Sequence, residues 1–173
     1  MNKPTVTGIE RELTSVDIIV SKSDEKGNIT YVSPIFIKIS GYTQGELLGK
    51  PHSILRHPDM PKAIFRYLWS NIKEGKNVMA YVKNLCENGD HYWVIADIKV
   101  GKNPDGSFRN YMSTRRNIST TAKNSIAGLY TKILDEEKTN GDEASYAMFD
   151  KFLVQQNINS IDDFNQFMQK LNK

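Results

Sequence analysis

The sequence has very little cysteine and no long apolar run. Cys86 is the single cysteine among 173 residues, so the chain cannot form an internal disulfide, and nothing indicates an oxidising compartment. No segment reaches the about 18 consecutive apolar residues that a membrane-spanning helix needs. The first residues, MNKPT, lack the apolar core of a signal peptide. We therefore expect a reduced, soluble, cytoplasmic protein that does not insert into a membrane.

The excess of charge of one sign is also small. The sequence contains 23 Lys and Arg against 20 Asp and Glu, which gives a formal net charge of +3. These positive charges are scattered rather than gathered in one segment, unlike those of nucleic-acid-binding proteins. We therefore expect no nucleic-acid partner.

Motifs of several enzyme classes are absent as well. The sequence contains no Walker loop, no nucleotide-binding kinase motif and no nucleophile elbow. Residues that bind metals occur in two groups, His52 with His57 and Asp59, and Cys86 with His91. Neither spacing matches a structural zinc site. We therefore expect no enzyme and no metal centre.

Hydrophobic periodicity predicts an α+β domain over residues 17–118. Turn signals separate the last three β-rich runs, which is typical of an antiparallel meander. Apolar residues three and four apart predict a helix over 60–73, and Thr43 with Glu46 matches a capping box. The predicted strands are 17–21, 29–32, 78–85, 92–100 and 108–118.

The regions on either side of this domain have different patterns. Residues 1–16 are expected to form an N-terminal arm or a short helix. Residues 119–173 are expected to form a helical tail, because apolar stripes recur with helical spacing over 122–137 and 160–171. The apolar stripe of each tail helix must be buried against another surface.

Several short motifs carry a family resemblance. Residues 27–32 (GNITYV), 40–43 (SGYT), 46–49 (ELLG) and 88–93 (NGDHYW) resemble a PAS sensor domain. Residues 49–61 (GKPHSILRHPDMP) are more specific and resemble the FAD-binding PAS domain of aerotaxis and energy-taxis receptors. The resemblance implies a PAS fold, with a five-stranded antiparallel sheet, helices over one face and the cofactor between them.

The resemblance also implies a set of cofactor-binding residues. They are His52, Arg56, His57, Asp59, Trp69, Asn84 and Arg115. The strand pattern supports a pocket independently, because Asn84 shares a face with Val82 and Ala80, and a carboxamide on an apolar face needs a hydrogen-bond partner. From the residues alone, a backbone partner for Asn84 is as plausible as a ligand.

The other candidates also have alternative interpretations. By themselves, Arg56, His57 and Asp59 favour a solvated loop with a local ion pair. The resemblance instead implies that Arg56 and His57 neutralise a pyrophosphate, with Asp59 orienting them. The Trp69 indole can stack on a flat cofactor or simply pack in the core. The Arg115 guanidinium can stabilise a reduced anionic ring or stand exposed at the end of a strand.

FAD is preferred over FMN through the resemblance alone. A haem ligated by His57 or His52, and an adaptor domain without cofactor, are the alternatives. His52 stands where light-sensing flavin PAS domains carry a cysteine that forms an adduct, so we expect no covalent photocycle. Ser33 stands where the family often has asparagine, so one polar contact to the flavin is expected to be shortened or lost.

The implied function is redox or energy-state sensing in signal transduction. The chain contains neither the membrane anchor nor the coiled coil of the receptors, and it resembles the stand-alone PAS subunits of bipartite energy-taxis systems. We expect it to relay the flavin redox state to a separate membrane chemoreceptor or transducer, through Trp93 on the outer face of the sheet or through the helical tail. A homodimer, and a tail that packs on the sheet or only on itself, remain alternatives.

Overall fold

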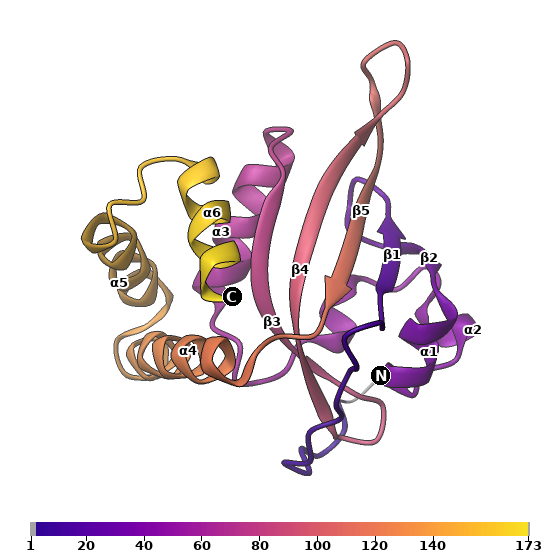
Figure 1. The fold of residues 1–173 in the computed structure, drawn as a ribbon, viewed down its shortest axis with the longest axis horizontal. Helices are drawn as coiled ribbons and strands as arrows, with labels where there is room; N and C mark the ends of the chain where they lie inside the picture. Colours follow the sequence, from indigo (N-terminus) through magenta and orange to yellow (C-terminus); the bar gives the residue numbers. More distant parts are fainter. Residues whose placement is uncertain (1–2, 173) are drawn as a thin grey trace.

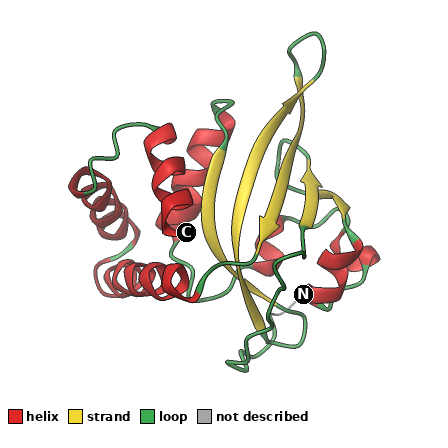
Figure 2. Ribbon diagram, viewed as in Figure 1, coloured by secondary structure: helices red, strands yellow, loops and turns green. Residues whose placement is uncertain are grey.

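The structure, a computed structural model, describes residues 3–172. Its elements are β1 (Ile19–Ser23), β2 (Ile29–Val32), α1 (Pro34–Ser40), α2 (Gln44–Leu47), the 3-10 helix η1 (His52–Leu55), α3 (Lys62–Lys73), β3 (Val78–Leu85), β4 (His91–Lys102), β5 (Phe108–Arg116), α4 (Thr120–Asn140), α5 (Asp142–Gln155) and α6 (Ile161–Leu171). The strands form one antiparallel sheet in the order β2-β1-β5-β4-β3 (Figures 1 and 2). The predicted α+β fold is confirmed.

Local side-chain chemistry sets several element boundaries. The Thr43 hydroxyl accepts a hydrogen bond from the Glu46 amide at 3.3 Å, and the Glu46 carboxylate accepts one from the Thr43 amide at 2.8 Å. This capping box starts α2 as predicted. Helix α3 starts at Lys62, two residues later than predicted, because Pro61 occupies the capping position. Strand β1 starts at Ile19 because the Asp17 carboxylate closes a turn with the Thr14 amide at 2.8 Å.

Residues 3–16 form an extended arm, so the alternative prediction of a short helix was wrong. The arm runs beside the turn between β3 and β4. The Thr7 amide donates to the Gly89 carbonyl at 3.0 Å, and the Arg11 amide donates to the His91 carbonyl at 2.7 Å. These long-range backbone bonds satisfy groups that a helix would have paired internally.

The inner face of the sheet forms the main core with α1, α2, η1 and α3. Alternation along β3 places Val78, Ala80, Val82 and Asn84 on this buried face, as predicted for Asn84. Phe36 of α1 and Ile64 of α3 are buried against the same face. The helices therefore leave Asn84 as one of few polar groups in an apolar layer.

Helices α4 and α6 pack against the sheet at its β3 edge, whereas α5 packs on α3 and α4, away from the strands (Figure 1). The Tyr130 hydroxyl of α4 donates to the Tyr81 carbonyl at 2.9 Å, and the Tyr81 hydroxyl donates to the Met168 carbonyl of α6 at 3.0 Å. The tail is therefore not a bundle that packs only on itself.

Trp93 lies on the outer face, as strand parity predicted, but it is only partly exposed. Its ring centroid is 6.3 Å from that of Tyr130, so α4 packs over it. Packing of the tail on the outer face near Trp93, one of the expected alternatives, is thus what the structure shows, and a partner contact through Trp93 stays a prediction. On the β1–β2 side of the outer face, Ile18 is 43% and Tyr31 45% exposed.

Candidate functional site

A cavity, partly open to solvent, lies between α3 and the inner face of the sheet. Its walls are mostly apolar. A neighbouring groove shares His52, Phe65, Trp69 and Asn84 with the cavity and extends to Lys26 and Arg56. An apolar cavity with a few polar groups is typical of a small-molecule site.

Arg115 of β5 is the charged group of the cavity. Its side chain is 8% exposed, and its Nη1 donates to the Ser21 hydroxyl at 2.9 Å. Burial lowers the pKa of Arg115 to about 10, so it remains a cation at neutral pH. Within residues 3–172, no carboxylate forms an ion pair with it. A buried cation without a carboxylate favours an anionic or electron-rich ligand.

His52 of η1 faces the cavity as a neutral imidazole. Burial first, and then the charge of Arg115, lower the pKa of His52 to about 3. Its Nε2 lies 3.4 Å from the Ser21 hydroxyl. Because Ser21 already accepts from Arg115, its own hydrogen is available to Nε2, which leaves the other ring nitrogen of His52 as a donor.

Three buried polar atoms around the cavity and groove lack a hydrogen-bond partner among the described residues. They are Asn84 Nδ2, Ser113 Oγ and Arg56 Nε. Asn84 and Ser113 line the cavity, whereas Arg56 lines the groove. Buried polar groups are normally paired, so these atoms fit a ligand with a polar edge.

Two aromatic rings of α3, Phe65 and Trp69, separate the cavity from the groove and line both. The Trp69 ring lies edge-on to Tyr111 with centroids 5.8 Å apart. The guanidinium of Arg56 lies over the Phe65 ring at 4.0 Å. These flat walls fit a flat aromatic cofactor.

Five of the seven predicted site residues, His52, Arg56, Trp69, Asn84 and Arg115, line the cavity or the groove. The structure does not place His57 and Asp59 there.

His57 is 1% exposed, and its ring contacts His91 with centroids 5.5 Å apart. The Asp59 side chain is 58% exposed, and its carboxylate pairs with Lys83 at 2.6 Å. The backbone bridge between Arg56 and Asn84 turns Arg56 toward the groove and the next side chain away from it.

Sequence reasoning missed Ser21 and Ser23, which line the cavity from β1. Both alternate with Ile19 on the buried face. Two serines on a buried strand face were the available signal, but the predicted strand ended at Ser21 and so left out Ser23. Ser33 and Cys86 do not line the cavity or the groove. The Ser33 hydroxyl accepts a hydrogen bond from the Val20 amide at 3.0 Å, and the Cys86 thiol donates one to the Ile39 carbonyl at 3.3 Å.

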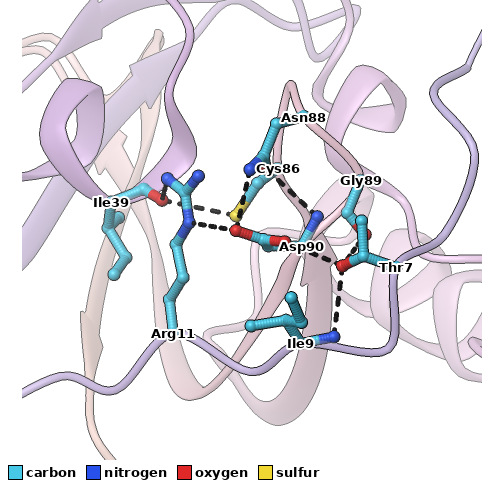
Figure 3. A network of polar contacts seen from close by, with 8 residues as sticks. All are labelled: Thr7, Ile9, Arg11, Ile39, Cys86, Asn88, Gly89 and Asp90. Carbon is cyan, nitrogen blue, oxygen red and sulfur yellow. Dashed lines mark hydrogen bonds and ion pairs between the residues drawn. The ribbon is translucent and has the colours of Figure 1, made fainter.

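The N-terminal arm is held by a polar network around Asp90, shown in Figure 3. The Asp90 carboxylate accepts from the Thr7 hydroxyl at 2.7 Å, Asn88 Nδ2 at 2.8 Å and Arg11 Nε at 3.0 Å. These hydrogen bonds lower the pKa of Asp90 to about 2. Arg11 also donates to the Ile39 carbonyl at 3.0 Å. The arm is therefore attached both to the β3–β4 turn and to the end of α1.

Two features are absent from residues 3–172. That part of the chain contains no helix long and apolar enough to cross a membrane. It also contains no group of three or more His, Cys, Asp or Glu side chains able to hold a metal ion.

Comparison with known proteins places the fold. The sequence pattern of the PAS fold matches residues 29–115. The aerotaxis receptor of Escherichia coli strain K12 is 38% identical over 137 residues, which are 79% of this chain and 27% of the receptor. The nitrogen fixation regulatory protein of Klebsiella pneumoniae is 28% identical over 104 residues, 60% of this chain and 21% of that protein. The chain thus spans only about a quarter of these relatives.

Solved structures show the same architecture. A light-oxygen-voltage domain studied with a flavin analogue superposes with a TM-score of 0.55 and 21% identity, covering 69% of this chain and 87% of that domain. The light state of the Aureochrome1 LOV photoreceptor superposes with a TM-score of 0.54 and 20% sequence identity. The match covers 66% of this chain and 88% of that chain. By fold and by sequence, the chain belongs to the PAS fold family.

Proposed function

We propose that this PAS domain is a sensor that binds a flavin, and FAD in particular, and relays the redox state of that flavin to a separate signalling protein. The observation that carries the proposal is the buried Arg115 cation, which lines the cavity without a carboxylate partner among residues 3–172. Similarity to an aerotaxis receptor supports a role in sensing, and similarity to light-oxygen-voltage domains supports a flavin ligand.

The residues of the cavity suit a flavin in three ways. Arg115 would hold positive charge against a ring that gains negative charge, and neutral His52 would add a hydrogen bond without adding charge. Asn84 and Ser113 would pair with the polar edge of the ring through their free groups. Phe65 and Trp69 would cover the ring and exclude water. When bound, a flavin supplies reversible uptake of electrons.

The preference for FAD rests on the groove beside the cavity. A dinucleotide extends past the ring and carries a pyrophosphate, which cations bind well. Arg56 and Lys26 line the groove, and the buried Nε of Arg56 has no partner among the described residues. We assign the pyrophosphate of FAD to the groove, beside Arg56 and Lys26. His57 and Asp59 have no direct role in this proposal.

The proposed output is a protein contact rather than a catalysed reaction. The partner would be a membrane chemoreceptor or similar transducer of chemotaxis. Because α4 packs over Trp93, we place the contact on the outer face in the area marked by the exposed apolar side chains of Ile18 and Tyr31. This area and the tail helices are the surfaces through which the protein would act.

An absorption spectrum of purified full-length protein tests the cofactor. A flavin gives bands at roughly 370 and 450 nm, whereas a haem gives a sharp Soret band. Chromatography of the ligand released by denaturation then separates FAD from FMN. A Soret band would replace the flavin proposal by a haem sensor, and a colourless protein that takes up no added flavin would indicate an adaptor domain.

The relay is tested by capture of the partner. Oxidised and chemically reduced protein are used to capture transducers from cells, beside an Ile18→Asp variant. We expect reduction to change the amount of captured chemoreceptor-like protein and Ile18→Asp to lower it. Equal capture by all three samples would contradict the relay but not the cofactor.

A further inference from the structure

Two faces of helix α3 contact different parts of the protein. One face carries Phe65, Leu68 and Trp69, which line the cavity. The other face contacts the C-terminal tail, mainly α5. The centroid of the Tyr67 ring is 5.5 Å from that of Phe149 in α5 and 4.7 Å from that of Phe164 in α6. The helix that walls the cavity is therefore packed directly against the tail.

The first turn of α3 depends on the tail for a hydrogen bond. Pro61 at the capping position offers no side-chain acceptor. The Glu137 carboxylate of α4 accepts from the Lys62 amide at 2.8 Å instead. Lys62 Nζ in turn pairs with Asp142 of α5 at 2.8 Å. A carboxylate at a helix N-terminus stabilises the helix through both the hydrogen bond and the helix dipole.

Glu137 also acts on the groove electrostatically. Burial lowers the pKa of Arg56, and the negative charge of Glu137 opposes that shift. Arg56 lies over the Phe65 ring, which belongs to α3. One carboxylate of the tail thus caps the start of the cavity helix and adds negative charge to the surroundings of Arg56.

We infer that Glu137 is a positioning residue for the cavity and couples ligand binding to the state of the tail. It holds the first turn of α3, which carries Phe65 and, one turn later, Trp69. Movement of α3 when the cavity fills would strain the Glu137–Lys62 bond and the contacts of Tyr67 with the tail. The tail would then report occupancy of the cavity by a route that bypasses the sheet. The ligand part of this inference rests on the proposed flavin function.

The test uses full-length Glu137→Ala, its conservative counterpart Glu137→Gln, and Asp135→Ala as the control. Asp135 is an exposed acidic residue of the same helix, so its removal makes the same change in net charge. Amide hydrogen exchange is measured over Lys62–Lys73 without ligand, and flavin release is followed by fluorescence. Loss of the cap should speed exchange in the first turns of α3 by about fivefold, the size expected for a lost helix cap. Flavin release should accelerate with it.

Hydrogen exchange over α3 tests the positioning role of Glu137, and flavin release tests the coupling of the tail to ligand binding. Glu137→Gln keeps an acceptor oxygen and should recover most of the wild-type exchange. If Glu137→Ala and Asp135→Ala show the same exchange over α3, the positioning role is overturned whether or not flavin binds. If wild type takes up no flavin, the proposed function fails, and exchange over α3 alone decides the role of Glu137. Faster exchange with unchanged flavin release would overturn the coupling.

Discussion

The indole ring of Trp69 lies directly on Gly27 in the turn between β1 and β2. A Cβ atom placed on Gly27 would be 2.5 Å from Cη2 of Trp69, well inside van der Waals contact. Gly27 also has a φ of +84°, which side-chain-bearing residues rarely adopt. This turn thus fixes the ring that separates the cavity from the groove.

Gly27→Ala should therefore both destabilise the fold and disturb the site. Gly106→Ala is the matched control, because Gly106 has a φ of +86° but no atom within 4 Å of the added methyl group. Both variants should lose about 1 kcal/mol to backbone strain. Only Gly27→Ala should also shift Trp69 and weaken flavin binding. Urea unfolding and flavin titration check this, and equal flavin affinity of the two variants would disprove the role of the contact.

Arg115→Met should weaken flavin binding by on the order of tenfold, since a charged hydrogen-bond donor is lost. The free protein should lose little stability, because the buried cation has no carboxylate partner in the described chain and its removal relieves a desolvation cost. Arg116→Met removes a charge from the neighbouring exposed position and is the control. Isothermal titration and urea unfolding measure both effects. A similar flavin affinity for the two variants would argue against Arg115 as a ligand contact.

Stability should fall as the pH drops below about 6.5, the ordinary pKa of histidine. Burial lowers the pKa of His52 to about 3 and that of His57 to about 4. Between these values and 6.5, the unfolded chain binds protons that the folded chain does not, so protonation favours unfolding. Each histidine contributes at most about 1.4 kcal/mol per pH unit in this window and nothing above pH 7.

The measurement is the free energy of unfolding between pH 7 and pH 5, where most carboxylates stay ionised. His52→Gln should make the free energy of unfolding depend less steeply on pH, because the contribution of one histidine is removed. An unchanged slope in the variant would show that His52 titrates normally in the folded protein.

Asp90→Asn should release the N-terminal arm. The carboxylate accepts bonds from Thr7, Arg11 and Asn88, and the amide that replaces it keeps only part of that capacity. Hydrogen exchange at the Thr7 and Arg11 amides should rise, with Asp97→Asn on the outer face as the control. Hydrogen bonding lowers the pKa of Asp90 to about 2. In the wild type the arm should therefore stay attached to the β3–β4 turn above pH 4 and detach as the pH falls through 2. Exchange equal to that of the control would contradict this role.

The sequence by itself determined the elements whose signals are local. The Thr43 capping box, the glycine turns and the alternation along β3 depend on neighbours a few residues away, and all three appear in the structure as predicted. Alternation also determined that Asn84 faces inward and Trp93 outward. Periodicity likewise identified the tail helices, because an amphipathic stripe is a property of one segment.

Tertiary structure decided which of these faces meet. His57 and Asp59 lie one and three residues after Arg56, yet only Arg56, which forms a backbone bridge with Asn84, lines the groove. The Ser21 hydroxyl contacts both Arg115 and His52 only because β1 pairs with β5. Ser21 and Arg115 are 94 residues apart in the sequence. The packing of α4 on Trp93 and of Glu137 on Lys62 also depends on long-range contacts. Such contacts follow from how whole faces pack, and no local pattern of residues records them.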